Sequence, residues 1–148
     1  MKLGLAALAM IMATPAAADP VADIKAARAV YNAAIAARDA VGVRAALGEG
    51  YVGIAGTGGE AIIGADAMAD YFARAFKTPG FLGFVRTPDV VTVAAPPQRA
   101  MERGHWSGGS LTGRFSGEYL AAWVPTPTGW KLRSETFVTL SNGAPGKP

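Results

Sequence analysis

Two glutamates and a tyrosine in the C-terminal half of the chain are of the types that transfer protons. Glu102, Tyr119 and Glu135 each lie in a different run of alternating apolar and polar residues. Such alternation is typical of β-strands, whose successive side chains point to opposite faces. Carboxylates and a phenol on one apolar face could abstract a proton or orient a polar group of an apolar ligand. Glu102, Glu135 and Tyr119 are therefore the candidate catalytic residues.

The pairing of these strands decides whether the three side chains meet. Pairing Glu102 with Tyr119, and Tyr119 with Glu135 on the following strand, brings all three onto one face. The same registers give the further pairs Trp106–Phe115, Arg103–Glu118, Gly117–Phe137 and Ala121–Arg133. A shift by one residue would reverse the faces, so the prediction depends on the register.

Aromatic residues at strand and helix spacing predict an apolar pocket around this group. The expected lining residues are Tyr31, Phe72, Trp106, Phe115, Trp123, Arg133 and Phe137. The alternative is structural, because buried polar groups are normally hydrogen-bonded to one another. In that case Glu135–Arg133 and Glu102–Tyr119 are pairs inside the core, and the aromatic residues are ordinary packing.

Residues suited to metal, cofactor or nucleophilic chemistry are scarce. His105 is the single histidine, alternation turns it away from Glu102, and the chain has no cysteine. The glycine-rich segment 56–59 lacks the lysine of a phosphate loop, and no serine stands in a G-x-S-x-G motif. We therefore expect no metal site and no cofactor. The basic residues are scattered singly at a formal net charge of +3, which predicts no nucleic-acid-binding patch.

Four long runs must form the sheet that positions the candidate residues. They are Phe81–Ala94, Arg99–Ser107, Gly113–Pro125 and Gly129–Leu140. The connections between them are rich in proline and glycine and short enough for antiparallel neighbours. Thr87-Pro88 interrupts the first run, which predicts a bulge or an edge strand there. A shorter strand is expected over residues 51–55.

Helices are expected before these runs, over residues 20–38, 40–47 and 65–77. Asp19 and Asp39 are suitable N-caps for the first two, and Pro20 suits a first helical position. An apolar stripe on the first helix comprises Ile24, Ala27, Tyr31, Ala34 and Ile35, with Arg28 and Asn32 largely off it. Helices followed by a long antiparallel meander predict an α+β domain, a curved sheet with helices covering its concave face.

Three segments of the sheet resemble the C-terminal half of the nuclear transport factor 2-like superfamily. They are Ala100-x-Glu102-x-Gly104-x-Trp106, Gly117-x-Tyr119-x-x-x-Trp123 and Gly129-Trp130-Lys131-Leu132-Arg133-x-Glu135-x-Phe137. The resemblance covers residues 21–140 and is nearest to the SnoaL-like, ketosteroid-isomerase-like small domains. It implies a cone-shaped, cystatin-like roll that forms homodimers through its sheet.

Within that superfamily the function stays open. Its members include isomerases, cyclases, dehydratases and ligand-binding modules. The Asp/Tyr set of the isomerases and the His-Asp dyad of the dehydratases are not found in this sequence. The first expectation is a pocket for a small apolar or amphipathic molecule. The alternatives are an isomerase- or cyclase-type enzyme with a pocket glutamate as base, and a structural homodimerisation module with a filled cone.

The N-terminus has the pattern of a cleavable signal peptide over residues 1–18. Lys2 precedes an apolar run of 11 residues, residues 3–13, and three alanines end the segment before Asp19. Eleven residues of helix are too short to cross a bilayer. We therefore expect cleavage near Ala18-Asp19, a periplasmic or secreted protein without a stable membrane anchor, one domain over residues 19–140 and a flexible tail over 141–148.

Overall fold

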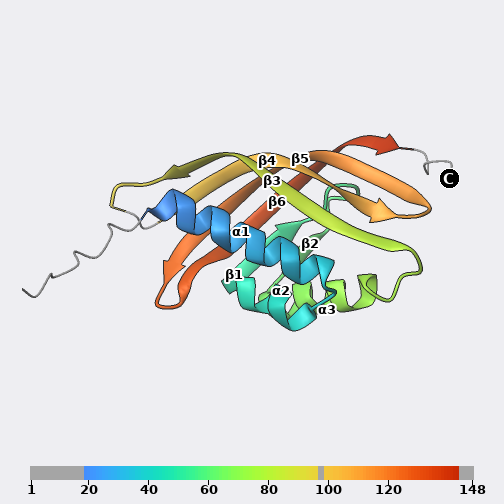
Figure 1. The fold of residues 1–148 in the computed structure, drawn as a ribbon, viewed down its shortest axis with the longest axis horizontal. Coiled ribbons are helices and arrows are strands. Elements are labelled where there is room, and N and C mark those ends of the chain that lie inside the picture. Colours follow the sequence, from blue (N-terminus) through green and yellow to red (C-terminus); the bar gives the residue numbers. More distant parts are fainter. Residues whose placement is uncertain (1–18, 97–98, 144–148) are drawn as a thin grey trace, which may run out of the picture.

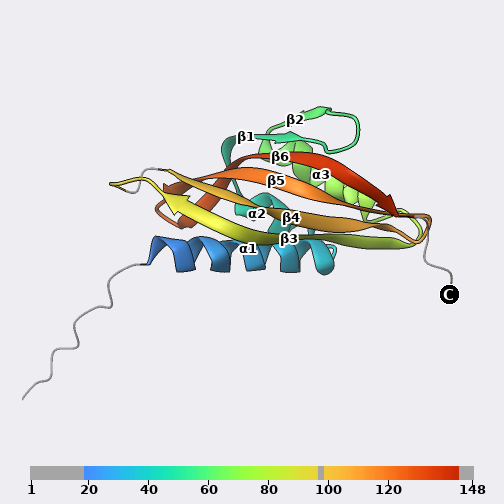
Figure 2. The same ribbon diagram turned by 90° about the horizontal axis from the view of Figure 1, so that it is seen from above.

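The computed structural model describes residues 19–96 and 99–143. Over these residues three helices lie against one face of a curved, six-stranded sheet, and the opposite face carries no helix (Figures 1 and 2). The elements in chain order are α1 (Pro20–Ala36), α2 (Ala40–Ala46), β1 (Leu47–Ile54), β2 (Ala61–Ile63), α3 (Ala65–Ala75), β3 (Phe81–Val93), β4 (Ala100–Ser110), β5 (Gly113–Thr126) and β6 (Gly129–Gly143). The predicted α+β class, with helices on the concave face, is confirmed.

Helix α1 begins as the sequence predicts. The Asp19 carboxylate accepts hydrogen bonds from the backbone amides of Val21 and Ala22, and Pro20 takes the first helical position. The buried side of the helix consists of Ile24, Arg28, Tyr31, Ala34 and Ile35. Arg28 was expected largely off the apolar stripe, and this expectation is wrong. It lies four residues after Ile24 and three before Tyr31, so helical geometry places it on their face.

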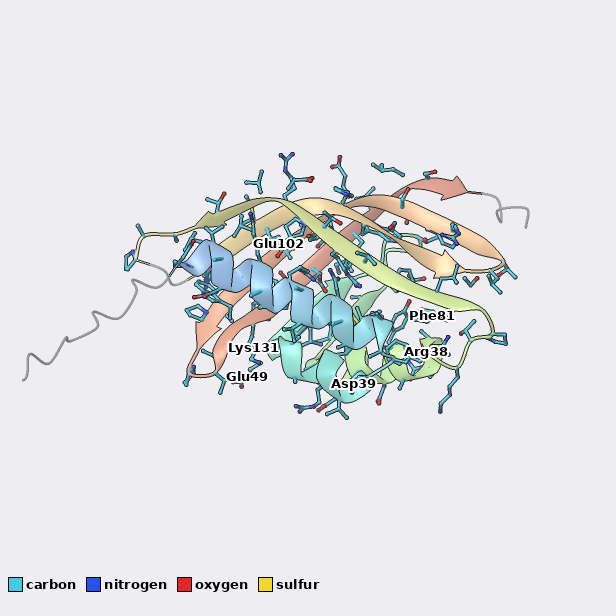
Figure 3. All side chains as sticks on the ribbon, in the orientation of Figure 1. Arg38, Asp39, Glu49, Phe81, Glu102 and Lys131 are labelled. Atoms are coloured by element: carbon cyan, nitrogen blue, oxygen red, sulfur yellow. The ribbon has the colours of Figure 1, made fainter. Side chains whose placement is uncertain are left out.

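The turn after α1 ties three parts of the domain together. Arg38 has a positive φ of 58°, which ends the helix at this point. Its guanidinium donates to the carbonyl oxygens of Phe76 at 3.3 Å and Phe81 at 3.2 Å. Figure 3 shows Arg38 and Phe81 near each other at the end of α1. These bonds fix the connection between α3 and β3 against the helical layer.

Helix α2 ends differently from the expectation. The chain passes directly from Ala46 into β1, so the strand starts at Leu47, whereas the helix was expected to reach residue 47 and the strand to start at residue 51. Leu47 is both the C-cap and the first strand residue, and its side chain is buried. Burial of this leucine against the sheet favours extended backbone over another helical turn.

The four long strands form the predicted antiparallel meander, and the sheet order is β2-β1-β6-β5-β4-β3. β3 is an edge strand with a register shift between Pro88 and Val90, as the interruption at Thr87-Pro88 predicts. Gly108, Gly109 and Ser110 belong to β4, although a turn was expected there; the turn falls at residues 111–112. β1 pairs in parallel with β6, so the sheet is mixed at this junction.

Two expectations concern the ends of the chain. The predicted signal peptide, residues 1–18, lies outside the described residues. β6 extends to Gly143, three residues past the expected domain end, and the remainder of the tail is likewise outside the described part. Among the described residues, no helix is long and apolar enough to span a membrane.

Candidate functional site

A cavity of about 640 Å³ opens between α3, the β1–β2 connection and the concave face of the sheet. Its aromatic wall consists of Tyr71, Phe72, Phe84, Trp106, Phe115 and Phe137. Thr57, Gly58 and Glu60 are exposed members of the lining, so the β1–β2 connection that carries them borders the opening of the cavity. Cavities of this size and mostly apolar lining are typical of small-molecule sites.

Several elements hold the cavity wall in place through contacts between aromatic rings. Phe72 of α3 packs edge-on against Phe84 of β3, with ring centroids 6.4 Å apart. Phe84 contacts Trp106, and Trp106 in turn meets Phe137 edge-on, both at 6.0 Å. The wall is therefore a continuous chain of rings from helix to sheet, which resists collapse into the cavity.

A glycine on β5 allows Trp106 to reach this position. The Trp106 indole donates to the carbonyl oxygen of Val138 on β6 at 3.2 Å, passing over Gly117 on the intervening strand. A Cβ at position 117 would lie 1.8 Å from the Val138 oxygen and 3.0 Å from the indole nitrogen. Gly117 is thus required for the close approach that fixes the indole.

The structure places four of the seven expected lining residues on the cavity wall. These are Phe72, Trp106, Phe115 and Phe137. Tyr31 and Trp123 are fully buried but are not part of the wall. Arg133 is exposed and belongs to neither the cavity nor the polar cluster, so its expected position is wrong. β6 has a bulge at Arg133, because Trp123 pairs with Leu132 and Ala122 with Ser134. The extra residue turns the Arg133 side chain outward and keeps Glu135 on the concave face.

The three candidate catalytic residues meet in a buried polar network, away from the cavity wall. The structure brings Glu102, Tyr119 and Glu135 onto the concave face, as predicted, but the registers differ. Glu102 pairs with Ala121 and Tyr119 with Phe137, each shifted by two residues from the expected partners. A shift by two preserves the face. Glu102 and Glu135 are 0 % and 1 % exposed, and none of the three lines the cavity.

Glu102 is surrounded by hydrogen-bond donors. Its Oε1 accepts from the Arg28 Nε at 2.8 Å and from the Tyr119 hydroxyl, and its Oε2 accepts from the Trp123 indole at 2.7 Å. Figure 3 shows Glu102 between α1 and the sheet. The predicted Glu102–Tyr119 pair is confirmed. A carboxylate with both oxygens occupied in this way is held as a structural anion.

Glu135 is bound to the same arginine. Its Oε1 accepts from the Arg28 Nη1 at 2.8 Å, and its Oε2 accepts from the Tyr51 hydroxyl at 2.9 Å. Arg28, which is 1 % exposed, therefore bridges two strands through both glutamates. The expected Glu135–Arg133 pair is wrong, because Arg28 occupies that role.

The ionisation of the network follows from its burial and charges. Burial alone would lower the pKa of Arg28, but the nearby Glu135 and then Glu102 outweigh it and raise that pKa. Burial, followed by the adjacent carboxylates, raises the pKa of Tyr51 and Tyr119 above the ordinary tyrosine range. The hydroxyls thus stay protonated and donate to the glutamates. Arg28 likewise keeps its positive charge in the buried network.

Among the lining residues that the sequence did not predict, which include Tyr71 and Phe84, Arg86 is the one buried charge. It lines the cavity, yet its side chain is 6 % exposed. Asn32 of α1 fixes its backbone, because the Asn32 amide donates to the Arg86 carbonyl at 2.8 Å and accepts from the Arg86 amide at 3.1 Å. The guanidinium carbon lies 5.0 Å from the Phe137 ring centre and 5.2 Å from that of Tyr31. A single arginine in a predicted strand carries no sequence pattern that would indicate this position.

Within the described ranges, no group of three histidine, aspartate or glutamate side chains could hold a metal ion. His105 lies on the helix-free face, with its Nδ1 3.2 Å from the Oδ1 of Asp89, and both side chains are exposed. This position agrees with the alternation that turns it away from Glu102. The pocket is therefore defined by aromatic walls and one buried cation.

The fold of this chain is similar to that of several solved structures. A ketosteroid isomerase-like protein from Erwinia carotovora atroseptica matches with a TM-score of 0.68 at 22% identity, over 83% of this chain and 98% of that one. A nuclear transport factor 2-like protein with a cystatin-like fold from Novosphingobium aromaticivorans gives a TM-score of 0.67 at 21% identity, covering 82% of each chain. A nuclear transport factor 2-like protein of unknown function from Shewanella oneidensis matches at 0.65 and 13% identity, over 80% of this chain and 98% of that one.

The chain has the nuclear transport factor 2-like fold. The resemblance seen in the C-terminal strands is confirmed at that level, since identities this low show the fold alone. No protein-family model matches the sequence, and no curated protein matches it either. The fold hosts many functions, so the function has to be argued from the site.

Proposed function

We propose that the protein binds a small molecule with an apolar body in the cavity beneath α3. The observation that carries the proposal is the cavity itself, an open pocket of about 640 Å³ with one wall of aromatic side chains. A cone filled by its own side chains would not leave this volume. Burial of an apolar ligand against these rings is favourable in proportion to the area removed from water.

Binding is favoured over catalysis by the buried glutamates. Glu102 and Glu135 are the residues that an isomerase- or cyclase-type mechanism would use as the base. Their oxygens already accept hydrogen bonds from Arg28, Tyr51, Tyr119 and Trp123. A general base must reach the proton that it abstracts, and neither carboxylate lies on the cavity wall.

A neutral, environment-sensitive dye tests the proposal. N-phenylnaphthylamine should bind the folded protein saturably, with enhanced fluorescence. Ala55→Phe adds a ring at a half-buried position on the cavity wall and should reduce dye binding at least about tenfold. Ala122→Phe is the matched control, because Ala122 is also half-buried but pairs with the exposed Met101 on the helix-free face. Equal dye binding by the two variants, both folded, would contradict the proposal.

We also propose that the protein is exported and that its mature chain begins at Asp19. The pattern of residues 1–18 supports the proposal. Mass spectrometry of the intact protein from the extracytoplasmic fraction should give the mass of residues 19–148. A full-length mass in the cytoplasmic fraction would contradict it.

A homodimer through the helix-free face of the sheet is a further proposal. That face exposes Met101, Leu120 and Val138, with exposed fractions of 45 %, 46 % and 53 %. Neighbouring exposed apolar side chains on a sheet favour association with another surface. Light scattering should give the mass of two chains, and Leu120→Asp should shift it to one. A monomeric wild-type protein at high concentration would contradict the proposal.

A further inference from the structure

The cavity, whose walls are mostly apolar, contains one buried cation, Arg86. Arg86 and Glu60 are the two charged side chains among the lining residues, and they differ in burial. Glu60 is exposed at the mouth, whereas Arg86 is 94 % buried (6 % exposed). A ligand that enters past Glu60 meets Arg86 at the inner end.

The hydrogen-bonding capacity of Arg86 is largely unused. Its Nη1 donates to the carbonyl oxygen of Phe84 at 3.5 Å, the upper limit for such a bond. Its Nε is enclosed and has no hydrogen-bond partner among the described residues. The nearest carboxylate oxygen, on Glu135, lies 3.9 Å from that Nε and is already bound by Arg28. The rings of Tyr31, Phe72 and Phe137 lie within 5.9 Å of the guanidinium carbon and offset part of the cost of burying it, but they do not replace the missing hydrogen bonds.

The enclosed polar atoms that have no partner in the described ranges, at Arg86 on the cavity wall and at Arg28 and Tyr31 behind it, can all donate a hydrogen bond. Besides the Arg86 Nε, the enclosed atoms without a partner in the described part of the chain are the Arg28 Nη2 and the Tyr31 hydroxyl. The guanidinium carbons of Arg86 and Arg28 lie 5.2 Å and 5.5 Å from the centre of the Tyr31 ring. The Arg86 Nε and the Arg28 Nη1 also lie 3.9 Å and 2.8 Å from the same oxygen of Glu135, so these groups are close together. Their complement is an acceptor with negative charge. An ammonium group, which can only donate, would match them poorly, and a ligand hydroxyl would accept from them but would bring no compensating charge.

We propose that the ligand of this cavity is a carboxylate with an apolar, preferably aromatic, body, and that Arg86 binds the carboxylate end. The inference rests on the proposed function and names the ligand class. A planar guanidinium forms two parallel bonds to a carboxylate, which makes arginine the preferred partner of this group. The aromatic walls hold the body of the ligand, and the charged end points inward because Glu60 at the mouth repels it.

A matched pair of probes tests the proposal on the wild-type protein. Naphthaleneacetate and naphthaleneacetamide have the same shape, but only the former is charged at neutral pH. Their affinities are measured by displacement of N-phenylnaphthylamine. The carboxylate should bind about tenfold more tightly or better, since charge-assisted hydrogen bonds are roughly twice as strong as neutral ones. The preference should weaken with added salt less than that of an exposed site.

Two variants at position 86 test whether Arg86 causes the preference for the carboxylate probe. Arg86→Met should abolish the preference for the carboxylate while leaving amide and dye binding, and Arg86→Lys should keep part of it. Arg103→Met removes the same charge from the helix-free face, where Arg103 is exposed, and should leave the preference unchanged.

The outcomes separate this inference from the proposed function. Equal displacement by the acid and the amide in the wild-type protein overturns the carboxylate proposal and leaves the apolar pocket standing. A preference that survives in folded Arg86→Met also overturns it. Absence of any dye binding overturns both. The wild-type comparison is decisive even if the Arg86 variants do not fold.

Discussion

The buried network around Arg28 and the cavity with Arg86 lie side by side on the concave face of the sheet. They differ in how far their polar groups are hydrogen-bonded. In the buried network, Arg28 donates to two glutamates at 2.8 Å each, and neutral donors occupy the remaining carboxylate oxygens. In the cavity, Arg86 makes one long hydrogen bond to a backbone oxygen. Every carboxylate oxygen of the network thus has a donor, and within the described residues only the Arg28 Nη2 is left without an acceptor, whereas the guanidinium in the open cavity has most of its donors unmatched. The state of the hydrogen bonds therefore separates a structural cluster from a ligand site better than residue type does.

Arg28 should be the most sensitive position in the molecule. Arg28→Met leaves Glu102 and Glu135 buried without their common cation, and we expect a loss of about 3–5 kcal/mol in the free energy of unfolding, or failure to fold. Urea denaturation measures the loss, with Arg103→Met as the exposed control. The variant that also carries Glu102→Gln and Glu135→Gln should be more stable than Arg28→Met alone, because the two buried carboxylates that Arg28 paired with are then neutral. A loss of less than about 1 kcal/mol in the free energy of unfolding of Arg28→Met would contradict the structural role of the network.

The fold was largely predictable from the sequence because local patterns determine its elements. The Asp19-Pro20 helix start, the alternation of the long strands and the interruption at Pro88 are each visible within a few residues. The faces of Glu102 and Glu135 also follow from alternation. The strand registers do not, since several pairings were equally complementary, and the bulge at Arg133 adds a residue that no local pattern indicates.

The site was less predictable because its chemistry depends on pairings between distant segments. Arg28 lies 74 and 107 residues from the glutamates that it binds. Its helical position beside Ile24 and Tyr31 could have indicated burial, but charge argued for the surface. Arg86 could be assigned only once α1 and α3 were placed against β3. The sequence patterns thus predicted the polar cluster and several residues of the cavity wall. They did not predict that the polar cluster is closed and that the open cavity lies beside it.

Alkaline pH should lower the free energy of unfolding through the buried tyrosines in and beside the network. Tyr31 and Tyr51 are fully buried, and burial followed by Glu135 raises the pKa of each. The unfolded chain ionises its tyrosines near about pH 10, whereas the folded protein does not. Stability from these groups is therefore complete below about pH 10 and is lost as the pH rises, by at most about 1.4 kcal/mol per pH unit for each tyrosine.

Urea denaturation at several alkaline pH values measures this loss. Tyr31→Phe supplies the control, because the Tyr31 hydroxyl has no partner within the described residues. That variant should match the wild-type stability at neutral pH and lose stability less steeply above about pH 10. An unchanged slope would show that Tyr31 ionises freely in the folded protein.

Removal of one donor from the network should have a moderate effect. Tyr119→Phe keeps the ring but leaves Glu102 without one of its hydrogen bonds, and we expect a loss of about 1–3 kcal/mol in the free energy of unfolding. Tyr71→Phe, at a 38 % exposed position on the cavity wall, should change it by less than about 0.5 kcal/mol. Equal losses in the two variants would remove the distinction between network and wall.

The smallest effect on stability should come from the cavity wall, where the effect on binding is larger. Phe115 is half-buried and lines the cavity, so Phe115→Leu removes ring contacts with a ligand while keeping an apolar side chain. We expect a change in stability below about 1 kcal/mol and a severalfold weaker affinity for N-phenylnaphthylamine. Denaturation and dye titration on the same samples give both numbers. A large loss of stability with unchanged dye binding would mean that Phe115 belongs to the core, and that the cavity is bounded by other residues.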